Sequence, residues 1–218
     1  MSRDAAPDPV VLTYAAGIGE QETVMLEDGS QVVLNTASRV EVRYADTERR
    51  IALTAGQPLF EVRREARPFV VEAGGTETRA LGTRFDVYLP KGDGVQVTLL
   101  EGFVRVSEDA AGGNVILSPG EQMTLRAGER TVSSVDTSQF KTWAPGMIPF
   151  TDVTLAIVAA QLNRYSATKI RVDEAIAGGR ISGAFRAGDQ EGFATALEAF
   201  MQVTAERRRD ETPIRRRQ

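Results

Sequence analysis

The chain of 218 residues contains neither cysteine nor histidine. Without cysteine it can form no disulfide, thiol nucleophile or thiolate metal site, and without histidine it lacks the commonest metal ligand and the commonest general base. These absences exclude most familiar active sites, so the sequence predicts a protein that is not an enzyme and that holds no cofactor or metal. They leave the cellular compartment open, because domains of ordinary size need no disulfides even in oxidising surroundings.

Long apolar runs are absent as well. Nowhere do about 18 uncharged apolar residues follow one another, as a membrane-spanning helix requires, and residues 1–9 lack the apolar stretch of a signal peptide. The formal net charge is -4 and the pI is about 5.1, which gives no overall positive field that would attract nucleic acid. We therefore expect no nucleic-acid partner.

The first two thirds of the sequence contain a β pattern. Residues 23–26 and 31–34 flank the pair Asp28-Gly29, which predicts a β-hairpin with a type I′ turn because glycine accepts a positive φ there. Apolar and polar residues then alternate along several short stretches, as half-buried strands require. The apolar members are Val40, Val42 and Tyr44, then Ile51 and Leu53, then Phe60 and Val62, then Phe69 and Val71.

Four glycines each precede an alternating stretch. Gly56, Gly82, Gly102 and Gly120 stand at unequal intervals, which argues against a strict solenoid. A glycine before each strand nevertheless suits a bend that turns the chain into the next layer of a stacked β structure. We therefore predict a mainly β protein in which residues 14–135 form one stacked, solenoid-like all-β domain, preceded by a disordered segment at residues 1–13.

The pattern changes after this domain. Residues 136–146 contain Pro145, Gly146 and the single tryptophan, Trp143, and are predicted to be a linker. Beyond the linker the apolar spacing becomes that of amphipathic helices, which indicates a second domain over residues 147–218. Its short strands are expected at residues 147–150, 170–172 and 180–185, with a closing hairpin at residues 203–207 and 212–216.

Two helices are predicted between these strands. Asp152 is expected to cap the first helix and Asp189 the second. Their apolar faces are Leu155, Val158, Ala159 and Leu162 in the first helix, and Phe193, Ala196, Leu197 and Phe200 in the second. This order of elements predicts a small split β-α-β domain of the α+β class, with both helices on one face of a single sheet.

A set of short motifs runs in a fixed order through most of the chain. The set includes Leu26-Glu27-Asp28-Gly29-Ser30, residues 80–88 and 95–106 on either side of a Lys-Gly-Asp-Gly turn, Leu117-Ser118-Pro119-Gly120-Glu121, residues 155–166, and Ile181-Ser182-Gly183-Ala184-Phe185. This ordered set resembles the FecR family, membrane-anchored anti-sigma regulators of iron-uptake signalling in Gram-negative bacteria. The C-terminal part resembles the family's secretin/TonB short N-terminal (STN) module. Residues 146–150 carry one residue more than the family pattern, so we expect a bulged or edge strand around Pro149.

The resemblance implies a periplasmic, signal-receiving role. The chain would be an excised periplasmic region whose membrane helix and cytoplasmic segment are not part of this sequence. It would bind the signalling domain of a TonB-dependent outer-membrane transporter and transmit the availability of iron or a siderophore. Its second partner would be an ECF-type sigma factor, bound through the cytoplasmic segment. Such a protein acts by contact and has no direct small-molecule substrate.

Self-cleavage is the one reaction that the resemblance implies, and it concerns the Gly82-Thr83 bond. In several relatives a Gly-Thr bond in this context breaks itself by an N-to-O acyl shift, in which the threonine hydroxyl attacks the preceding carbonyl. A strained turn before the strand would assist the attack. The simpler interpretation is a glycine bend followed by an ordinary β-branched strand residue.

Partner binding is expected in the C-terminal domain. A short strand at a sheet edge can accept a strand from another protein through main-chain hydrogen bonds. The candidate residues are Ile181, Ser182, Gly183 and Phe185 on the predicted third strand, and Asn163, Arg164 and Tyr165 at the end of the first helix. Each of them can equally be structural.

Two alternative functions, a binding module and a hydrolase, would each require a specific feature. A carbohydrate- or envelope-binding β module would show an exposed aromatic platform on the first domain. A hydrolase would need a carboxylate pair such as Glu72 with Glu77 in an apolar cleft, and the sequence gives no sign of one. The arginine runs at residues 207–209 and 215–217 could dock an acidic partner or contact anionic lipid headgroups, although a solvated surface is the simpler explanation.

Overall fold

The computed structural model describes residues 10–92, 94–108, 113–137 and 146–217. The chain divides into two compact units, the first made by the chain up to Gly17 together with Gln21–Asp136, and the second by Ile18–Glu20 together with the chain from Thr137 onward. The predicted mainly β architecture is confirmed: two seven-stranded sheets are followed by a small region of short helices and strands. Residues 138–145 of the predicted linker, with Trp143, lie outside the described residues.

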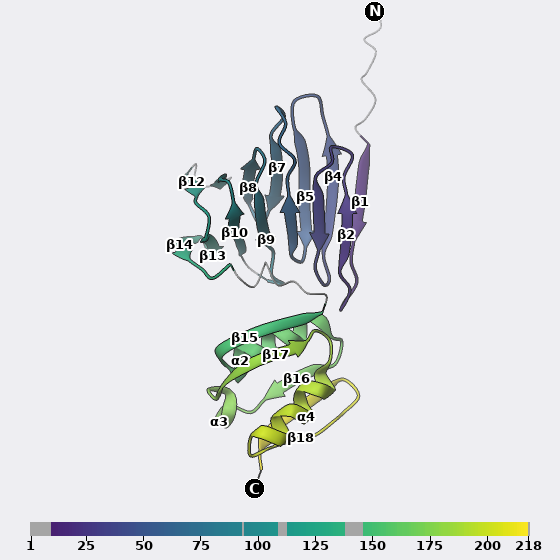
Figure 1. Cartoon of the computed structure of the whole chain (residues 1–218), viewed down its shortest axis with the longest axis vertical. Helices are drawn as coiled ribbons and strands as arrows, with labels where there is room; N and C mark the ends of the chain where they lie inside the picture. Colours follow the sequence, from purple (N-terminus) through teal and green to yellow (C-terminus); the bar gives the residue numbers. More distant parts are fainter. Residues whose placement is uncertain (1–9, 93, 109–112, 138–145, 218) are drawn as a thin grey trace, which may run out of the picture. The chain divides into compact units, whose positions relative to one another are not determined.

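The first unit consists of two sheets (Figure 1). In sheet order, one contains β1 (Val11–Ala15), β4 (Arg39–Tyr44), β5 (Arg49–Ala55), β7 (Phe69–Ala73), β8 (Thr76–Ala80), β11 (Val104–Glu108) and β12 (Asn114–Leu117). The other contains β14 (Glu129–Ser134), β13 (Glu121–Arg126), β10 (Val95–Glu101), β9 (Arg84–Tyr88), β6 (Pro58–Glu61), β3 (Gln31–Leu34) and β2 (Glu22–Met25). The first strand thus begins at Val11, three residues before the expected start of the domain.

The alternating apolar residues of both sheets form one core. At its centre the ring of Phe60 on β6 lies 5.6 Å from that of Phe69 on β7 and 5.2 Å from that of Phe85 on β9, measured between centroids. All three side chains are fully buried. Burying one such side chain stabilises the fold by roughly 1.5–3 kcal/mol, so this contact between sheets is a main source of stability.

The four repeated glycines lie where the chain crosses between the sheets, as predicted. Each has a positive φ: Gly56 between β5 and β6, Gly82 between β8 and β9, Gly102 between β10 and β11, and Gly120 between β12 and β13. A residue with a Cβ adopts this conformation only with strain, which explains why glycine recurs at the crossings. The crossing from β3 to β4 uses Ala37 instead, with a φ of 52°.

The β2–β3 hairpin is confirmed, but its predicted type I′ turn is wrong. The Gly29 N–H donates to the Leu26 carbonyl, and the Leu26 N–H donates to the Ser30 carbonyl. Within the turn only Gly29 has a positive φ, whereas a type I′ turn needs one at both central residues. Asp28 therefore keeps an ordinary backbone conformation, and its side chain is free to turn inward.

The second unit contains two small sheets. Strands β15 (Met147–Thr154) and β17 (Arg180–Arg186) form an antiparallel pair, and β16 (Lys169–Val172), β19 (Glu211–Arg216) and β18 (Val203–Ala205) form the other sheet. The helices are α2 (Leu155–Leu162), the 3-10 helix η1 (Asn163–Tyr165), α3 (Glu174–Ala177) and α4 (Gln190–Phe200). Within the ranges described, no helix is long and apolar enough to span a bilayer.

The expectation of a single sheet with both helices on one face is wrong. Phe185 of β17 packs edge-on against Phe193 of α4, with centroids 4.9 Å apart, and Ile214 of β19 belongs to the same core. The helices therefore share one core with both sheets. Strand β15 is bulged, as expected, but the bulge lies between Phe150 and Val153 and not at Pro149 itself.

The helix predictions are partly correct. The first helix buries the four predicted residues. It begins after Thr154 without a side-chain cap, because Asp152 lies in the β15 bulge and forms an ion pair with Arg180. Asp189 caps α4 as predicted, accepting a hydrogen bond from the Gly192 N–H. Phe200 was expected on the buried face but is 89% exposed, because it is the last residue of the helix.

Candidate functional site

The described strands of the second unit form four sheet edges, and side chains cover the edge formed by β18. The Ala205 N–H donates to the carboxylate of Glu198 at 2.8 Å. The Val203 carbonyl accepts from the guanidinium of Arg217 at 3.0 Å, and the Ala205 carbonyl accepts from Arg207 at 3.3 Å. These are the main-chain groups that a neighbouring strand would need, so β18 has little left to offer one.

The edge formed by β16 is covered by a single side chain. The amide of Asn163 accepts from the Ile170 N–H at 2.7 Å and donates to the Ile170 carbonyl at 2.8 Å. Asn163 therefore makes the pair of hydrogen bonds to Ile170 that a residue of a neighbouring strand would make. Its side chain is occupied within the protein, which gives a structural reason for this residue beside its predicted role in partner binding.

Strand β15 forms the third edge, and a proline in this strand removes one hydrogen-bond donor from the edge. Met147–Thr154 pairs with β17 on one side only, and Pro149 lies opposite Ala184. The Ala187 N–H donates to the Gly146 carbonyl, and hydrogen-bonded pairs alternate along an antiparallel ladder. Pro149 therefore falls at a pair that exchanges no hydrogen bonds, so its missing N–H removes a donor from the outer edge and not from the ladder.

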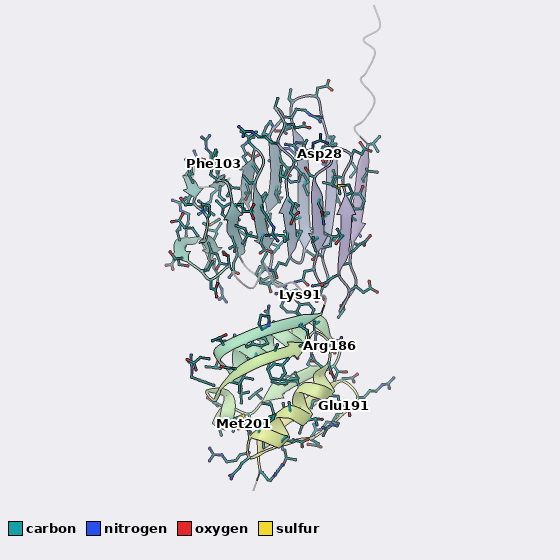
Figure 2. All side chains as sticks on the ribbon, viewed as in Figure 1. Asp28, Lys91, Phe103, Arg186, Glu191 and Met201 are labelled. Carbon is teal, nitrogen blue, oxygen red and sulfur yellow. The ribbon has the colours of Figure 1, made fainter. Side chains whose placement is uncertain are left out.

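The fourth edge, formed by β17, is open. By the same alternation Ile181, Gly183 and Phe185 turn their main-chain groups toward β15, while Ser182, Ala184 and Arg186 turn theirs away from it. In the part of the chain that the structure describes, no strand pairs with that outer side. The residues Ser182, Gly183 and Ala184 are all exposed, so the edge is accessible. Arg186, at one end of this edge, is labelled in Figure 2.

The predicted residues on β17 have different tasks. Phe185 and Ile181 pack into the core of the unit, where Phe185 contacts Phe150 at 6.2 Å between centroids. The hydroxyl of Ser182 accepts the Asp152 N–H at 2.9 Å and so fixes the β15 bulge. Gly183 is the exposed residue at the middle of the open edge. The predicted set does not include Ala184, whose main-chain groups face outward.

The predicted residues on η1 lie on a different element. Tyr165 is buried, and the guanidinium of Arg164 lies 5.8 Å from the centroid of its ring. A Cβ on Gly188, in the turn after β17, would come within 3.2 Å of the Tyr165 carbonyl oxygen. The structure therefore brings η1 close to the end of β17 but does not make it part of the open edge.

The candidate cleavage site lies at a crossing between the two sheets of the first unit. Gly82 has a φ of 99°, and Thr83 is only 7% exposed. The hydroxyl of Thr83 has no hydrogen-bond partner among the described protein atoms, while its carbonyl accepts the Val62 N–H at 2.9 Å. A Cβ on Gly82 would lie 2.8 Å from Cβ of Arg64. The backbone is thus held in a conformation that only glycine adopts easily.

Charged residues surround this crossing. Thr83 lines an open groove of about 570 Å³ together with Glu61, Arg84 and Glu101. Arg84 lies between the two carboxylates, 2.9 Å from that of Glu61 and 3.8 Å from that of Glu101. The groove is therefore polar and accessible to water, which the hydrolysis of an ester would require.

The carboxylate pair considered for hydrolysis has another role. Glu72 and Glu77 lie opposite each other on β7 and β8, and both form ion pairs with Arg50. The three side chains sit on a half-exposed sheet surface and not in an apolar cleft. Their arrangement explains the pair as an ion-pair network that relieves repulsion between two like charges.

Comparison with known proteins agrees with this architecture. Residues 13–105 match the family model described as FecR protein, so this part of the chain is a FecR domain. The fold is similar to that of a crystal structure at 2.50 Å resolution, described as a candidate anti-sigma factor from Parabacteroides distasonis. The two structures superpose with a TM-score of 0.76 at 20% sequence identity, and the match covers 95% of this chain and 99% of that one. A second, at 1.65 Å, has the same TM-score and identity, with coverages of 94% and 99%. No curated protein matches the chain.

Proposed function

We propose that the chain is the signal-receiving region of a FecR-like transmembrane anti-sigma regulator. Two findings support the proposal: the FecR domain at residues 13–105, and a fold shared over 95% of the chain with a protein described as a candidate anti-sigma factor. In this role the region lies in the periplasm and receives the signal by contact. An ECF-type sigma factor is the second partner, bound through a cytoplasmic segment outside this sequence.

The partner that we propose for the second unit is the signalling domain of a TonB-dependent outer-membrane transporter. The observation that carries this is the difference between the four edges: Asn163 covers β16, Glu198 and arginines cover β18, Pro149 blunts β15, and β17 is left open. Proteins generally protect their edges, because an open edge pairs with other chains. An edge kept open among three protected ones is suited to accepting a strand.

We propose that the added strand bonds to the outward main-chain groups of Ser182 and Ala184, because the Arg186 carbonyl already accepts the Asp189 N–H at 3.2 Å. Main-chain hydrogen bonds would supply affinity, and the exposed outer face of β15 and β17 would supply specificity. Occupation of this edge would report the state of the transporter, and hence the availability of iron or a siderophore. No reaction is needed for this transmission.

We also propose that the Gly82-Thr83 bond breaks itself once during maturation. Thr83 Oγ attacks the Gly82 carbonyl carbon, the C–N bond breaks, and the amine of Thr83 takes up the proton that the hydroxyl loses. Water then hydrolyses the resulting ester, which leaves a carboxylate on Gly82 and restores the hydroxyl of Thr83. The left-handed φ of Gly82 and the unpartnered hydroxyl of Thr83 support this step.

The binding proposal can be tested with one substitution on the open edge. Ala184→Pro removes an outward N–H and leaves the β15 ladder intact, whereas Ala184→Ser keeps the N–H and serves as the matched control. Isothermal titration with the transporter signalling domain encoded beside this protein should give binding for the wild type and for Ala184→Ser, and at least about tenfold weaker binding for Ala184→Pro. Equal affinities for all three proteins would refute strand addition, and no binding by the wild type would refute the partner.

A carbohydrate-binding module is not supported by the described surface. Phe103 is the one exposed aromatic residue among the described residues of the first unit, with 66% of its surface accessible (Figure 2). A sugar-binding platform stacks a ring against one or more flat aromatic faces, and a single phenylalanine does not form one.

A further inference from the structure

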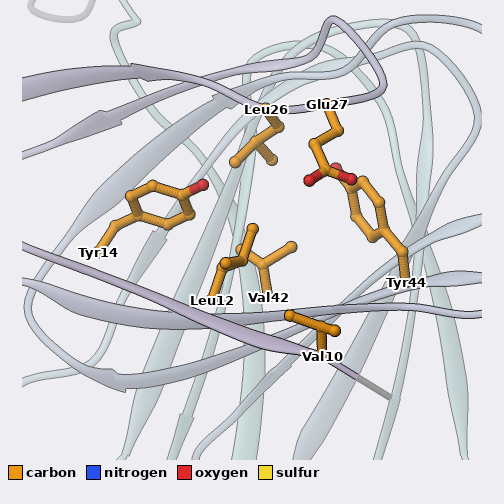
Figure 3. A pocket seen from close by; sticks show the side chains of 7 residues that line it. All are labelled: Val10, Leu12, Tyr14, Leu26, Glu27, Val42 and Tyr44. Carbon is orange, nitrogen blue, oxygen red and sulfur yellow. The ribbon is translucent and has the colours of Figure 1, made fainter. Parts of the chain in front are cut away.

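A small cavity opens at the β1 and β2 end of the first unit (Figure 3), and its lining includes none of the residues of the candidate cleavage site. Leu12 and Val42 line one side of the cavity and Leu26 lies across from them. The rings of Tyr14 and Tyr44 stand on opposite sides, and the carboxylate of Glu27 hangs over the space beside Tyr44. The residues come from β1, from β4 and from the turn between β2 and β3, so the fold assembles the cavity from three separate segments.

The size of the cavity limits what it can hold. Its volume is about 200 Å³. Pockets for drug-sized molecules generally measure about 300–1,000 Å³, so this one has room for a single side chain or a group of that size. The aliphatic side chains of Leu12, Leu26 and Val42 suit an apolar stem, because contact with it would remove their apolar surface from water.

The charge of the cavity comes from Glu27. Among the described residues Glu27 forms no ion pair, and its side chain is exposed. The nearest other acid, Asp28, is already neutralised by the buried guanidinium of Arg49. Arg67 lies over the ring of Tyr44 at 5.9 Å, but it is paired with Glu65 at 2.6 Å. One uncompensated negative charge therefore remains beside the cavity.

The two tyrosines add to the attraction for a cation. The hydroxyl of Tyr44 donates to Asp28 at 2.8 Å, so this phenol is not available to a ligand and presents its ring instead. Burial, followed by that hydrogen bond, raises the pKa of Tyr44, so the ring stays neutral, and the charge of Glu27 acts in the same direction. Electron-rich ring faces attract cations, as the position of Arg67 over Tyr44 already illustrates.

We propose that this cavity binds one cationic side chain, a lysine or an arginine, of a partner protein. The aliphatic stem of that side chain would lie between Leu26 on one side and Leu12 and Val42 on the other. Its charge would lie between the two tyrosine rings, within reach of Glu27. This site is separate from the open edge of β17, and the inference does not depend on the proposed transporter partner.

The test uses n-butylammonium as the probe and isotope-labelled protein observed by NMR. Titration at constant ionic strength should shift the amide signals of Leu12, Tyr14, Leu26 and Glu27 in a saturable way, with an affinity in the millimolar range that about five heavy atoms can provide. Glu27→Gln should weaken this affinity about three- to tenfold, because the ion pair and part of the attraction for the cation are lost. Glu41→Gln, which removes a half-buried carboxylate that pairs with Arg43 elsewhere on β4, should leave it unchanged.

Three results would overturn the proposal. The first is an equal response to n-butanol, which has the stem but no charge. The second is an unchanged affinity in Glu27→Gln, and the third is no shift with n-butylammonium. Binding of the transporter domain by Glu27→Gln is measured in parallel, so that failure of this site and failure of the proposed partner can be told apart.

Discussion

The guanidinium of Arg49 and the carboxylate of Asp28 form a fully buried ion pair between the two sheets of the first unit, with Nη1 and Oδ2 2.5 Å apart. The pair is well supplied with further hydrogen bonds. Asp28 also accepts from the hydroxyls of Ser30 and Tyr44, and Arg49 donates to the carbonyls of Arg63 and Arg67. The network therefore joins the β2–β3 turn to the start of β5 and to the segment between β6 and β7.

Replacing Asp28 by asparagine should destabilise the protein by about 3–5 kcal/mol, because it leaves the charge of Arg49 buried without a counter-ion. Urea unfolding monitored by circular dichroism would measure the loss. Glu41→Gln removes a partly exposed carboxylate that pairs with Arg43, and it should cost less than about 1 kcal/mol. Equal losses of unfolding free energy in the two variants would contradict a stabilising role for the buried Asp28–Arg49 pair.

The same pair should contribute to acid sensitivity. Burial by itself would raise the pKa of Asp28, but hydrogen bonds from Ser30, Arg49 and Tyr44 outweigh burial and lower it. A carboxylate whose pKa is lower in the folded state stabilises the fold fully above its unfolded value, near pH 3.9, and loses that contribution as the pH falls through the folded pKa. The stability difference between wild type and Asp28→Asn should therefore shrink below about pH 4. A difference that stays constant from pH 7 to pH 2 would contradict this assignment.

Gly82→Ala should cost more stability than Gly75→Ala. Both glycines have a positive φ, but a Cβ on Gly75 would meet nothing within 4 Å, whereas one on Gly82 would lie 2.8 Å from Cβ of Arg64. The backbone strain common to both is about 1–2 kcal/mol, and overpacking adds about 1–3 kcal/mol at Gly82. Thermal or urea unfolding of the two variants would measure the difference. Equal losses in the two variants would show that Arg64 moves aside.

Cleavage at Gly82 should leave the first unit in one piece. The β8–β11 and β6–β9 ladders join strands from before the bond to strands from after it. The protein should therefore run as two bands on a denaturing gel but as one peak in native size-exclusion chromatography. Thr83→Ala should remain a single band, and Thr83→Ser should still cleave because it keeps a hydroxyl. A wild-type protein that stays intact would refute self-cleavage.

Asn163→Ala should expose the β16 edge. Two hydrogen bonds to Ile170 are lost, which we expect to cost about 1–3 kcal/mol. The uncovered edge should also increase self-association, detectable by sedimentation velocity at rising concentration. Gln161→Ala, a nearby substitution on α2 whose side chain makes one long contact with Arg164, should change neither property. An Asn163→Ala protein that stays stable and monomeric would show that the edge needs no cover.

Local patterns in the sequence were sufficient to predict several features. Alternation of apolar residues predicted most strands, because a strand buries one face whatever its neighbours are. The repeated glycines predicted the crossings, because a positive φ is a local property of the backbone. The buried face of α2 and the cap of α4 by Asp189 followed from spacing alone.

Other features depended on contacts between distant segments. Asp28 looked like a turn residue in sequence, but Arg49 and Tyr44 draw its side chain into a buried network. Asp152 looked like a helix cap, but pairing with Arg180 places it in a bulge. At Asp152 a partner 28 residues away replaced the expected cap, whereas Asp28 keeps its turn and gains the buried contacts in addition.

The sequence by itself determined where strands, crossings and helices form, because those choices depend on residues that are neighbours along the chain. Only the tertiary structure decided which edges are covered and where the cavity beside Glu27 opens. Asn163 covers Ile170 and Tyr14 faces Tyr44 because separate segments pack together, and a pattern of residue types does not specify that packing. The open edge of β17 is likewise defined by what the other strands leave unpaired.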